Sequence, residues 1–517
     1  MFGVTTELLT TLFAITLTFF IISRFVFGPF RGGKKLPPSP RQWPLLGNLP
    51  EYLKAKSKGR WLCDVLEGFD KGIACVRIGS AHLILVSCPK IVLQIVKEQD
   101  AIFASRPKNM SSALFSRNYL TAVFPPHGDQ WKKMRKILTS EYISPARLRW
   151  FHDKRNSEAD NLVKWIYNLH DRPVNLRTVS RHYGANVTRK MVFGRRYLGE
   201  ARADGGPGTL EEEQVMAIFQ SLDYSFSFAI SDFFPILTGL DLDGQEKQAK
   251  EAFAMFNRLH DPIIEERIRK WRNGDVEKVD DFLDIMITLK DSYGKPLLST
   301  EEIKAQVIEI FMASTDNVAN SVEWVLAELL SQPELMRKAV KEVDEVVGKE
   351  RLVQESDIPN LHFLNACARE SFRLHPTAYF IPPHVAMADT TVAGYFIPKG
   401  SQVNLSRFGV GRNPKVWDDP LVFKPERHMK EASTMPVLTD LNARFISFGL
   451  GRRGCVAGNL GSLMTMMLLA LLVQGFDWEG EGSLDLMQTG DHTCLALAKP
   501  LEAKANPRLP PHLYGTT

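Results

Sequence analysis

The sequence predicts a mainly α-helical protein with a minor β part, organised as one large domain behind an N-terminal membrane anchor. Apolar residues recur at helical spacing over most of the 517 residues, whereas runs with strand-like alternation are short and few. Hydrophobic residues make up 44% and charged residues 24% of the chain, which is ordinary for a globular protein with a sizeable core. No repeat or flexible linker divides the main body. We therefore expect an anchor over residues 1–30, a basic, proline-rich hinge over residues 31–45 and a single domain over residues 46–517.

The anchor is the apolar segment Leu8–Phe27, which at 20 residues is just long enough to span a bilayer. Only Glu7 precedes it, whereas Lys and Arg follow, so the positive-inside rule leaves the rest of the chain in the cytosol. A cleaved signal peptide is the alternative, but its positive charge would come first and a small-residue cleavage site would follow. The proline run Leu36–Pro40 then favours extended backbone and predicts a stiff spacer.

The main body begins with a predicted hairpin of two strands, Ile73–Ile78 and His82–Val86, around a Gly-Ser turn. Helical periodicity dominates afterwards, and a glycine-rich surface loop is expected over residues 203–208. Short strands with Pro-Gly turns are expected over residues 392–404, and a last long helix after Cys455 runs through Gln474. The clearest predicted helices are Asp129–Leu138, Arg155–Leu169, Leu210–Leu222, Gln245–Arg272 and Leu298–Leu330.

Charge and cysteine content narrow the classes of function. The net charge of +5 is too weak to indicate nucleic-acid binding. The six cysteines form no CxxC pair, so no zinc site or disulfide framework is indicated, and a reducing compartment is expected for the main body.

The most specific signal is the loop Phe448–Ala457, in which glycines and two arginines surround Cys455 ahead of the last helix. A thiolate is stabilised by nearby positive charge and N–H donors, and Arg452 and Arg453 offer the charge. A single thiolate held in this way suits the iron of a haem. A buried structural cysteine beside a basic turn is the alternative interpretation, and the rest of the chain weighs against it.

A second signal is Glu370-x-x-Arg373, whose two side chains share one face of a helix and can pair. Arg427, in a Pro-Glu-Arg segment, is a candidate third member. A buried, fully hydrogen-bonded group of this kind fixes geometry more than it adds stability. Alone the motif is commonplace, but the order of the pair, the Pro-Glu-Arg segment and then the cysteine loop is specific.

Together with Trp131-x-x-x-Arg135, these motifs resemble the cytochrome P450 superfamily of haem-thiolate monooxygenases over essentially the whole chain. The resemblance implies that fold, a haem b cofactor with Cys455 as the iron ligand, and electrons from NADPH through an NADPH–cytochrome reductase. It also implies an endoplasmic reticulum membrane location. Cations and N–H donors suit the two haem propionates. The residues that the resemblance assigns to the propionates are Trp131, Arg135, His384 and Arg453.

The long helix departs from the superfamily pattern at two positions. Ser314 stands where Gly is usual, and Asn317 stands where a Thr usually helps to deliver protons. An amide can hold a water but donates protons poorly. Asp316 and Asn317 are therefore candidate catalytic residues for a reaction in which the substrate or water supplies the proton.

The same departure points to one plant family, because several segments are similar to the plant amino acid N-monooxygenases. These segments are Asp316–Asn320, Glu323-Trp324 and Pro425–His428. That family N-hydroxylates an L-amino acid twice, and loss of water and carbon dioxide gives an aldoxime, an early intermediate of cyanogenic glucosides and related defence compounds. One alternative is a plant cytochrome P450 that hydroxylates carbon on a terpenoid or phenylpropanoid. Another is an anchored haem protein that only binds or transfers electrons.

The segments that resemble substrate-contact regions are apolar and aromatic, which favours tyrosine or phenylalanine as substrate. Arg106 is a candidate partner for the substrate carboxylate, and Thr315 or Ser314 could meet a phenol hydroxyl. An arginine at position 106 is more often a haem or surface residue, and each of the other side chains is equally compatible with an ordinary core position. The candidates are Arg106, Phe124, Phe311, Met312, Thr315, Tyr379, Phe380, Ile381 and Cys494.

A basic cluster on the helix that carries Trp131 suggests a partner surface. Its members are Lys132, Lys133, Arg135 and Lys136. We expect the cluster to attract the acidic flavin domain of the reductase; a solvated helix face is the alternative.

Overall fold

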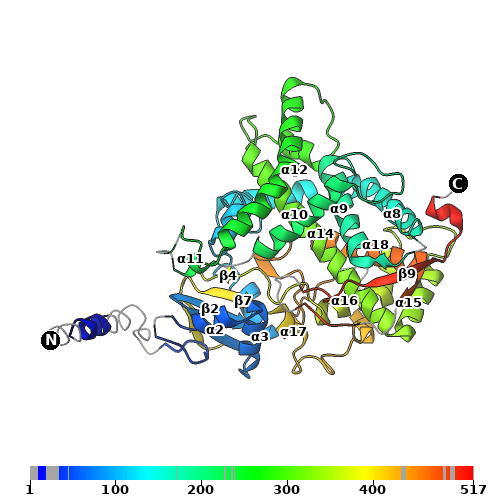
Figure 1. Ribbon diagram of the computed structural model, residues 1–517. Coiled ribbons are helices and arrows are strands. Elements are labelled where there is room, and N and C mark those ends of the chain that lie inside the picture. The colour runs from blue at the N-terminus through cyan, green and yellow to red at the C-terminus, as the bar shows by residue number, and fades with distance from the viewer. Residues whose placement is uncertain are drawn as a thin grey trace, which may run out of the picture.

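The computed structural model describes residues 10–18, 34–44, 46–169, 172–225, 229–234, 237, 239–431, 438–480, 485–489 and 495–515. Most of them are helical, and three small sheets lie toward the periphery. Figure 1 shows α14 (Thr300–Ser331) running through the middle of the helices, with the largest sheet to one side. The predicted class, mainly α with a minor β part, is confirmed.

Helix α14 is the centre of the fold. It packs against α9 (Leu176–Phe193), α10 (Thr209–Ser225), α12 (Gln245–Asn273), α16 (His362–Leu374) and α18 (Gly458–Gly475). Its first turn is fixed by a capping box in which the Ser299 hydroxyl accepts from the Glu302 amide at 3.2 Å and the Glu302 carboxylate accepts from the Ser299 amide at 2.9 Å.

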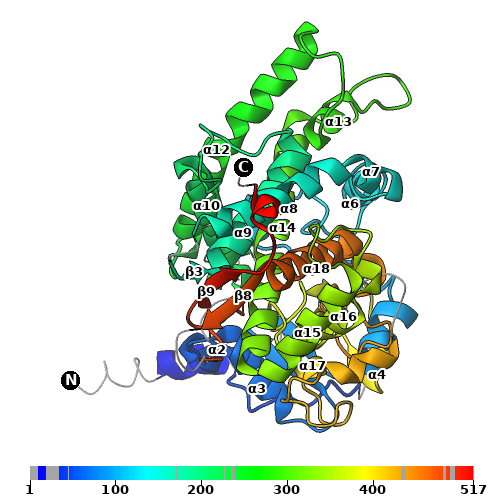
Figure 2. The ribbon, with the colours of Figure 1, turned by 90° about the vertical axis from the view of Figure 1, so that its right-hand side faces the viewer.

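The five helices predicted from periodicity all exist, and their ends differ from the prediction by no more than three residues. Helix α9 was not predicted. Its side chains are buried on nearly every side, including those of His182 and Arg189, so it lacks the one-sided apolar stripe that marks a surface helix. Figure 2 shows α9 between α8 (His152–Tyr167), α10 and α14.

The predicted hairpin forms the edge of a four-stranded sheet with the order β1-β2-β7-β4. β1 (Ile73–Ile78) and β2 (Ala81–Val86) pair antiparallel, and the turn uses Gly79 at φ 57°. β2 pairs parallel to β7 (Gln402–Leu405), and β7 pairs antiparallel to β4 (His384–Val385). This sheet therefore brings His384 beside the N-terminal part of the domain.

The remaining elements complete the periphery. The second sheet has the order β3-β9-β8, and β5 pairs with β6 as a separate hairpin. The strands are β3 (Val174–Asn175), β5 (Thr390–Val392), β6 (Tyr395–Ile397), β8 (Phe476–Gly480) and β9 (Glu502–Pro507). The α-helices are α2 (Leu49–Lys54), α3 (Lys58–Glu67), α4 (Pro89–Leu93), α5 (Met110–Phe115), α6 (Asp129–Ile137), α7 (Pro145–Trp150), α11 (Ile230–Phe233), α13 (Phe282–Thr288), α15 (Pro333–Val346) and α17 (Arg407–Gly411).

The predicted anchor lies largely outside the described residues. Residues 10–18 are helical and exposed, and their large apolar side chains face solvent. Across the described ranges, one helix, α18, has the length and composition of a membrane span, and most of it is buried in the core. The hinge is attached rather than free, because the carbonyls of Lys35 and Pro38 accept hydrogen bonds from the Phe396 and Cys75 amides at 2.8 Å each.

Candidate functional site

Cys455 lies at the end of a tightly turned loop ahead of α18. Gly449 (φ 65°) and Gly451 (φ 71°) have left-handed backbone, and a Cβ on Gly451 would lie 2.2 Å from the Val96 carbonyl oxygen. The Cys455 amide donates to the Phe448 carbonyl at 2.7 Å. The position of the sulfur therefore depends on glycine in this loop.

The charges around the sulfur differ from those predicted. Arg452 turns outward to Asp100 (Nε–Oδ2 3.1 Å), and Arg453 donates to the carbonyls of Ala104 and Pro125. Burial raises the pKa of the Cys455 thiol, and the Ala457 amide, Arg407 and Arg135 oppose this only in part. The prediction that Arg452 and Arg453 hold the thiolate is wrong, because both side chains are engaged elsewhere. A bound metal cation would hold the sulfur deprotonated.

Three accessible side chains lie in otherwise buried surroundings. Cys455 is accessible even though burial dominates its environment, so it borders a space inside the fold. On α14, Ala313 and Asn317 are exposed while Met312 and Thr315 are buried. Residues four apart share a helix face, and the Asn317 amide Nδ2 donates to the Ala313 carbonyl at 2.9 Å. This face of α14 thus also adjoins open space in the middle of the fold.

The predicted propionate contacts come together as a group of cations and N–H donors. No described carboxylate forms an ion pair with Arg106, Arg135 or Arg453. Burial, followed by Arg453 and Arg135, lowers the pKa of Arg106, and burial followed by Arg135 lowers that of Arg453 to about 9. Within the described part of the chain, Trp131 Nε1 and Arg453 Nη1 are buried without a hydrogen-bond partner. Uncompensated cations and unused donors fit a bound dicarboxylate such as haem.

His384 belongs to the same group. Its Nδ1 lies 2.8 Å from the Phe103 carbonyl oxygen. Burial and then Arg106 lower the pKa of His384 to about 3, with Arg453 adding to the effect. Arg106 donates to the carbonyl of Pro383 at 2.8 Å and to that of Pro382. The structure thus brings Arg106 to the predicted propionate contacts, which favours the haem-residue alternative over pairing with the substrate.

Glu370, Arg373 and Arg427 form the predicted network. Arg373 donates Nε and Nη2 to the two Glu370 carboxylate oxygens at 2.7 and 2.8 Å, and Arg427 donates Nε at 2.9 Å. His428 Nε2 lies 2.9 Å from Glu370 Oε2. Burial would raise the pKa of Glu370, but the hydrogen bonds from Arg373 and His428 lower it to about 2. The network ties α16 to the segment that leads to the cysteine loop.

The two candidate catalytic residues on α14 do not act from one face. Asn317 is exposed, whereas Asp316 is buried and forms an ion pair with Arg181 of α9 at 3.3 Å. Ser314 also contacts α9, and Thr315 is buried. The Thr315 hydroxyl donates to the Phe311 carbonyl at 2.9 Å, and the Ser314 and Thr188 hydroxyls lie 2.7 Å apart. The suggested contact of Thr315 or Ser314 with a substrate phenol is therefore not supported.

The apolar substrate candidates divide into residues of the core and residues near the cysteine loop. Phe311 is fully buried against Phe193, Phe256 and His260, so it is a core residue. Ile381 lies at the cysteine loop, because a Cβ on Gly449 would be 4.0 Å from it. Cys494 lies outside the described residues. Met312 and Tyr379 are buried in core clusters, Phe380 packs beside Tyr379, and Phe124 is buried in the segment between Arg106 and Trp131.

Two contributors were missed from the sequence. His428 was noted only as part of a motif, and its imidazole completes the Glu370 network. Glu309 of α14 accepts from the Ala122 and Val123 amides at 3.0 and 2.8 Å and so holds the segment ahead of Trp131. The sequence did contain a signal for Glu309, because it is an acidic residue in the apolar part of a predicted helix. A carboxylate buried there needs hydrogen-bond donors such as these two amides.

The predicted basic cluster on α6 is smaller than expected. Lys133 pairs with Glu302, and Arg135 donates to the Gly454 carbonyl at 3.1 Å, so both turn inward. Lys132 and Lys136 are exposed. The outward-facing part of the cluster is therefore these two lysines.

Comparison with known proteins gives concordant matches. Residues 37–505 match the family model described as Cytochrome P450. The chain is 52% identical to a valine N-monooxygenase of Manihot esculenta over 94% of this chain and 90% of that protein. It is 51% identical to a tyrosine N-monooxygenase of Sorghum bicolor (93% and 88%) and 49% identical to a phenylalanine N-monooxygenase of Prunus mume (98% and 99%). A zebrafish cytochrome P450 solved with progesterone superposes with a TM-score of 0.72 at 22% identity, covering 87% of this chain and 99% of that one.

Proposed function

This chain belongs to the cytochrome P450 family, and from this membership and its relatives we propose that the protein converts an L-amino acid to its aldoxime. It is a haem b oxidoreductase of the amino acid N-monooxygenase group and receives electrons from NADPH through a reductase. The proposed reaction is two N-hydroxylations followed by dehydration and decarboxylation. The observation that carries the proposal is that about half of the residues are identical to those of several N-monooxygenases over nearly the full length. The site also has unused hydrogen-bond donors that suit haem.

Bound haem supplies the activation of dioxygen. Cys455 would be its iron ligand, and Trp131, Arg106, Arg135, Arg453 and His384 would hold its propionates. Arg106, Arg135 and Arg453 are already fixed by carbonyl contacts, so they are preorganised for the carboxylates.

Asn317 is the proposed proton-handling residue on the accessible face of α14. Its amide oxygen is free to accept from a water or from the amino group of the substrate, because the amide nitrogen is used by the Ala313 carbonyl. Asp316 is proposed to act indirectly, since its carboxylate pairs with Arg181 on the other side of the helix.

We propose tyrosine or phenylalanine as the substrate. The support is the apolar, aromatic character of the segments beside the cysteine loop, including Phe124 and Ile381. The matched relatives are named for valine, tyrosine, tryptophan and phenylalanine at similar identity, so identity alone does not favour one of them. The product would be an early intermediate of plant defence metabolism.

The proposal includes attachment to the endoplasmic reticulum membrane through residues 1–30, with the catalytic domain in the cytosol. It is supported by the apolar segment Leu8–Phe27 and the basic residues that follow it. Deletion of residues 1–30 is expected to move the protein from the membrane to the soluble fraction while the haem absorbance is retained.

The decisive experiment is product analysis. The full chain is placed in membranes with a plant reductase and NADPH, and the protein amino acids are supplied one at a time. An oxime detected by mass from tyrosine or phenylalanine supports both reaction and substrate, and an oxime from valine only would correct the substrate. No oxime from any amino acid, with haem intact, would favour the carbon-hydroxylating alternative.

A further inference from the structure

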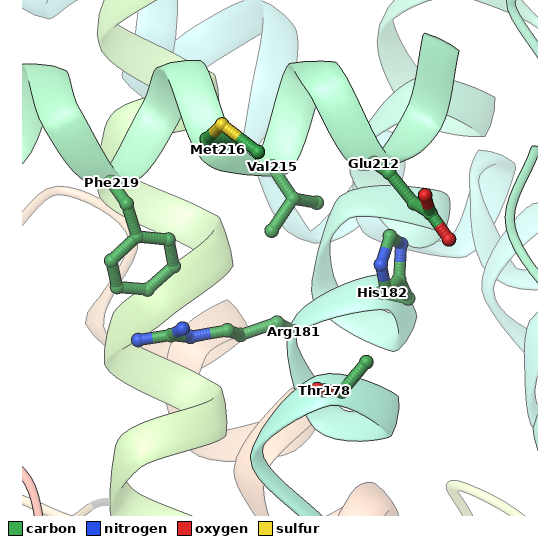
Figure 3. Close-up of a pocket in the computed structure, with 7 residues that line it drawn as sticks. All are labelled: Thr178, Arg181, His182, Glu212, Val215, Met216 and Phe219. Carbon is green, nitrogen blue, oxygen red and sulfur yellow. The ribbon is translucent and has the colours of Figure 1, made fainter. Parts of the chain in front are cut away.

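A pocket lies between α9 and α10 (Figure 3). It has a volume of about 280 Å³ and is lined by Thr178, Arg181, His182, Glu212, Val215, Met216 and Phe219. Figure 3 shows these side chains between α9 and α10, with Arg181 and Phe219 at one end and His182 and Glu212 at the other. Nothing in the proposed oxime chemistry uses this pocket.

Arg181 has unused capacity for hydrogen bonding. Its guanidinium donates Nη2 to Asp316 Oδ1 at 3.3 Å, a long contact, and no second described acceptor lies within hydrogen-bond distance. Its Nε is buried without a partner among the described residues. The guanidinium carbon lies 3.1 Å from the centre of the Phe219 ring, so the plane of the cation is held against an aromatic face. With 22% of its side chain exposed, Arg181 remains within reach of a ligand.

His182 is the second observation that indicates a ligand. It is only 4% exposed, yet Nδ1 has no hydrogen-bond partner within the described part of the chain. A buried polar atom without a partner is uncommon and costly. Burial, together with Arg189, Arg181 and Arg196, lowers the pKa of His182 to about 3, so the ring is neutral and lies in a positive field. A neutral imidazole can donate one N–H to an acceptor.

The chemistry of the walls specifies the ligand. The Arg181 guanidinium suits a carboxylate, the buried imidazole of His182 offers a hydrogen-bonding atom at the other end (Figure 3), and Val215, Met216 and Phe219 provide an apolar wall. The volume limits the ligand to a small molecule. We propose that this pocket is an accessory binding site for a small carboxylic acid with an apolar body, and that its carboxylate shares Arg181 with Asp316.

Two classes of small carboxylic acid fit these walls, the L-amino acids and the organic acids without an amino group. An L-amino acid carries an ammonium group on the carbon next to its carboxylate, and Glu212 is the carboxylate that lines this pocket. In that case the proposal rests on the proposed function, because the ligand would be the substrate itself. An organic acid without an amino group would leave Glu212 unused.

A ligand bound in this pocket would affect the residues at the reaction centre. Asp316 and Asn317 are adjacent on α14, and a carboxylate on Arg181 would weaken the ion pair between Arg181 and Asp316. The pocket could thereby adjust the position of the α14 segment that carries Asn317.

The test uses phenylacetate, which has a carboxylate and an apolar body but no nitrogen to hydroxylate. Binding to the haem-loaded full chain is measured by equilibrium dialysis, with phenethylamine as the probe that lacks the carboxylate. We expect saturable binding of phenylacetate and none of phenethylamine. Because no turnover is involved, this result is independent of whether the enzyme makes oximes.

Met216→Trp fills the pocket from an exposed position and leaves the Arg181–Asp316 pair in place, and Gln220→Trp on the same helix is the matched control. Binding should weaken at least about tenfold in Met216→Trp and in Arg181→Gln and stay unchanged in Gln220→Trp. The haem absorbance of Met216→Trp should equal that of the unaltered chain, which reports correct folding. Phenylacetate binding that is absent, or equal in Met216→Trp, overturns the proposal.

A competition arm separates the two classes of acid. Displacement of phenylacetate by phenylalanine, with the displacement lost in Met216→Trp, assigns the site to the amino acid. Displacement by phenylpropanoate but not by phenylalanine assigns it to acids without an amino group. Displacement by phenylalanine that persists in Met216→Trp means that the probe sits at the haem, and this contradicts the accessory site.

Discussion

At the scale of single residues, the site is defined by polar atoms that the protein leaves unused. Trp131 and Arg453 each keep a buried donor without a partner among the described residues, in a group whose arginines form no ion pair with a described carboxylate. An unused buried donor costs free energy in the folded protein, so its persistence implies that a ligand uses it. The haem propionates are the acceptors that family membership implies.

Trp131→Phe tests this directly, because it keeps the aromatic ring and removes only the N–H. Loss of one hydrogen bond to a charged group is expected to lower haem affinity roughly 10- to 100-fold. Haem retention is measured by absorbance after dialysis against a haem-binding protein. Trp478→Phe is the control, since its N–H donates to the Leu472 carbonyl far from the loop. Equal retention in the two variants would contradict the role of Trp131.

Asn317→Ala tests the accessible face of α14. Loss of the amide is expected to lower the oxime formed per NADPH consumed by about tenfold or more, because the group that positions the proton-supplying water or substrate is removed. Haem content should be unchanged. Ser314→Ala is the matched control, because that hydroxyl bonds to Thr188 on the α9 side. A full yield of oxime from Asn317→Ala would exclude a proton-handling role.

At the scale of elements, α6 serves two surfaces at once. Its inner face brings Trp131 and Arg135 to the haem group of donors and pairs Lys133 with Glu302 of α14. Its outer face carries Lys132 and Lys136. One helix thereby links the predicted reductase contact to the cofactor.

Charge reversal of the outer face, Lys132→Glu with Lys136→Glu, is expected to slow reduction by the flavoprotein several-fold and to abolish its dependence on ionic strength. Stopped-flow reduction measured over a range of salt concentrations checks this. Lys247→Glu, an exposed substitution on α12, should have no effect. Unaltered reduction by the double variant would remove α6 as the docking surface.

At the scale of the whole molecule, Glu370 joins α16 to the chain ahead of the cysteine loop. The hydrogen bonds from Arg373 and His428 outweigh burial and lower the pKa of Glu370 from 4.5 to about 2. The unfolded state therefore binds the proton more tightly than the folded state between these values. The ionised carboxylate stabilises the fold above about pH 4.5, by about 3 kcal/mol, and this stabilisation is lost as the pH falls toward 2.

Glu370→Gln is expected to destabilise the protein by about 3–5 kcal/mol at pH 7, because Arg373 would be left buried without its carboxylate. The difference in free energy of unfolding between this variant and the unaltered chain should narrow as the pH falls from 5 to 2. Chemical denaturation at a series of pH values measures it. A difference that does not vary with pH would mean that the carboxylate is not ionised in the folded protein.

Much of the fold could be predicted from the sequence, because long amphipathic helices and the β1–β2 hairpin carry their own periodicity. Helix α9 could not be, since a helix buried on all sides has no polar face to reveal its period. The Cys455 loop, the Glu370 group and the propionate contacts were predictable because spacing and resemblance fix which residues are involved.

The sequence by itself therefore determined the class of fold and the family, and it predicted most of the residues that we propose to hold the haem. Tertiary structure decided where the side chains on α14 and around Cys455 point. It paired Asp316 and Ser314 with residues of α9, buried Thr315, left Asn317 exposed, and paired Arg452 with Asp100. The reason is that a buried charged or polar group takes whichever partner the packing of distant elements brings within reach, and those partners lie more than a hundred residues away in the chain.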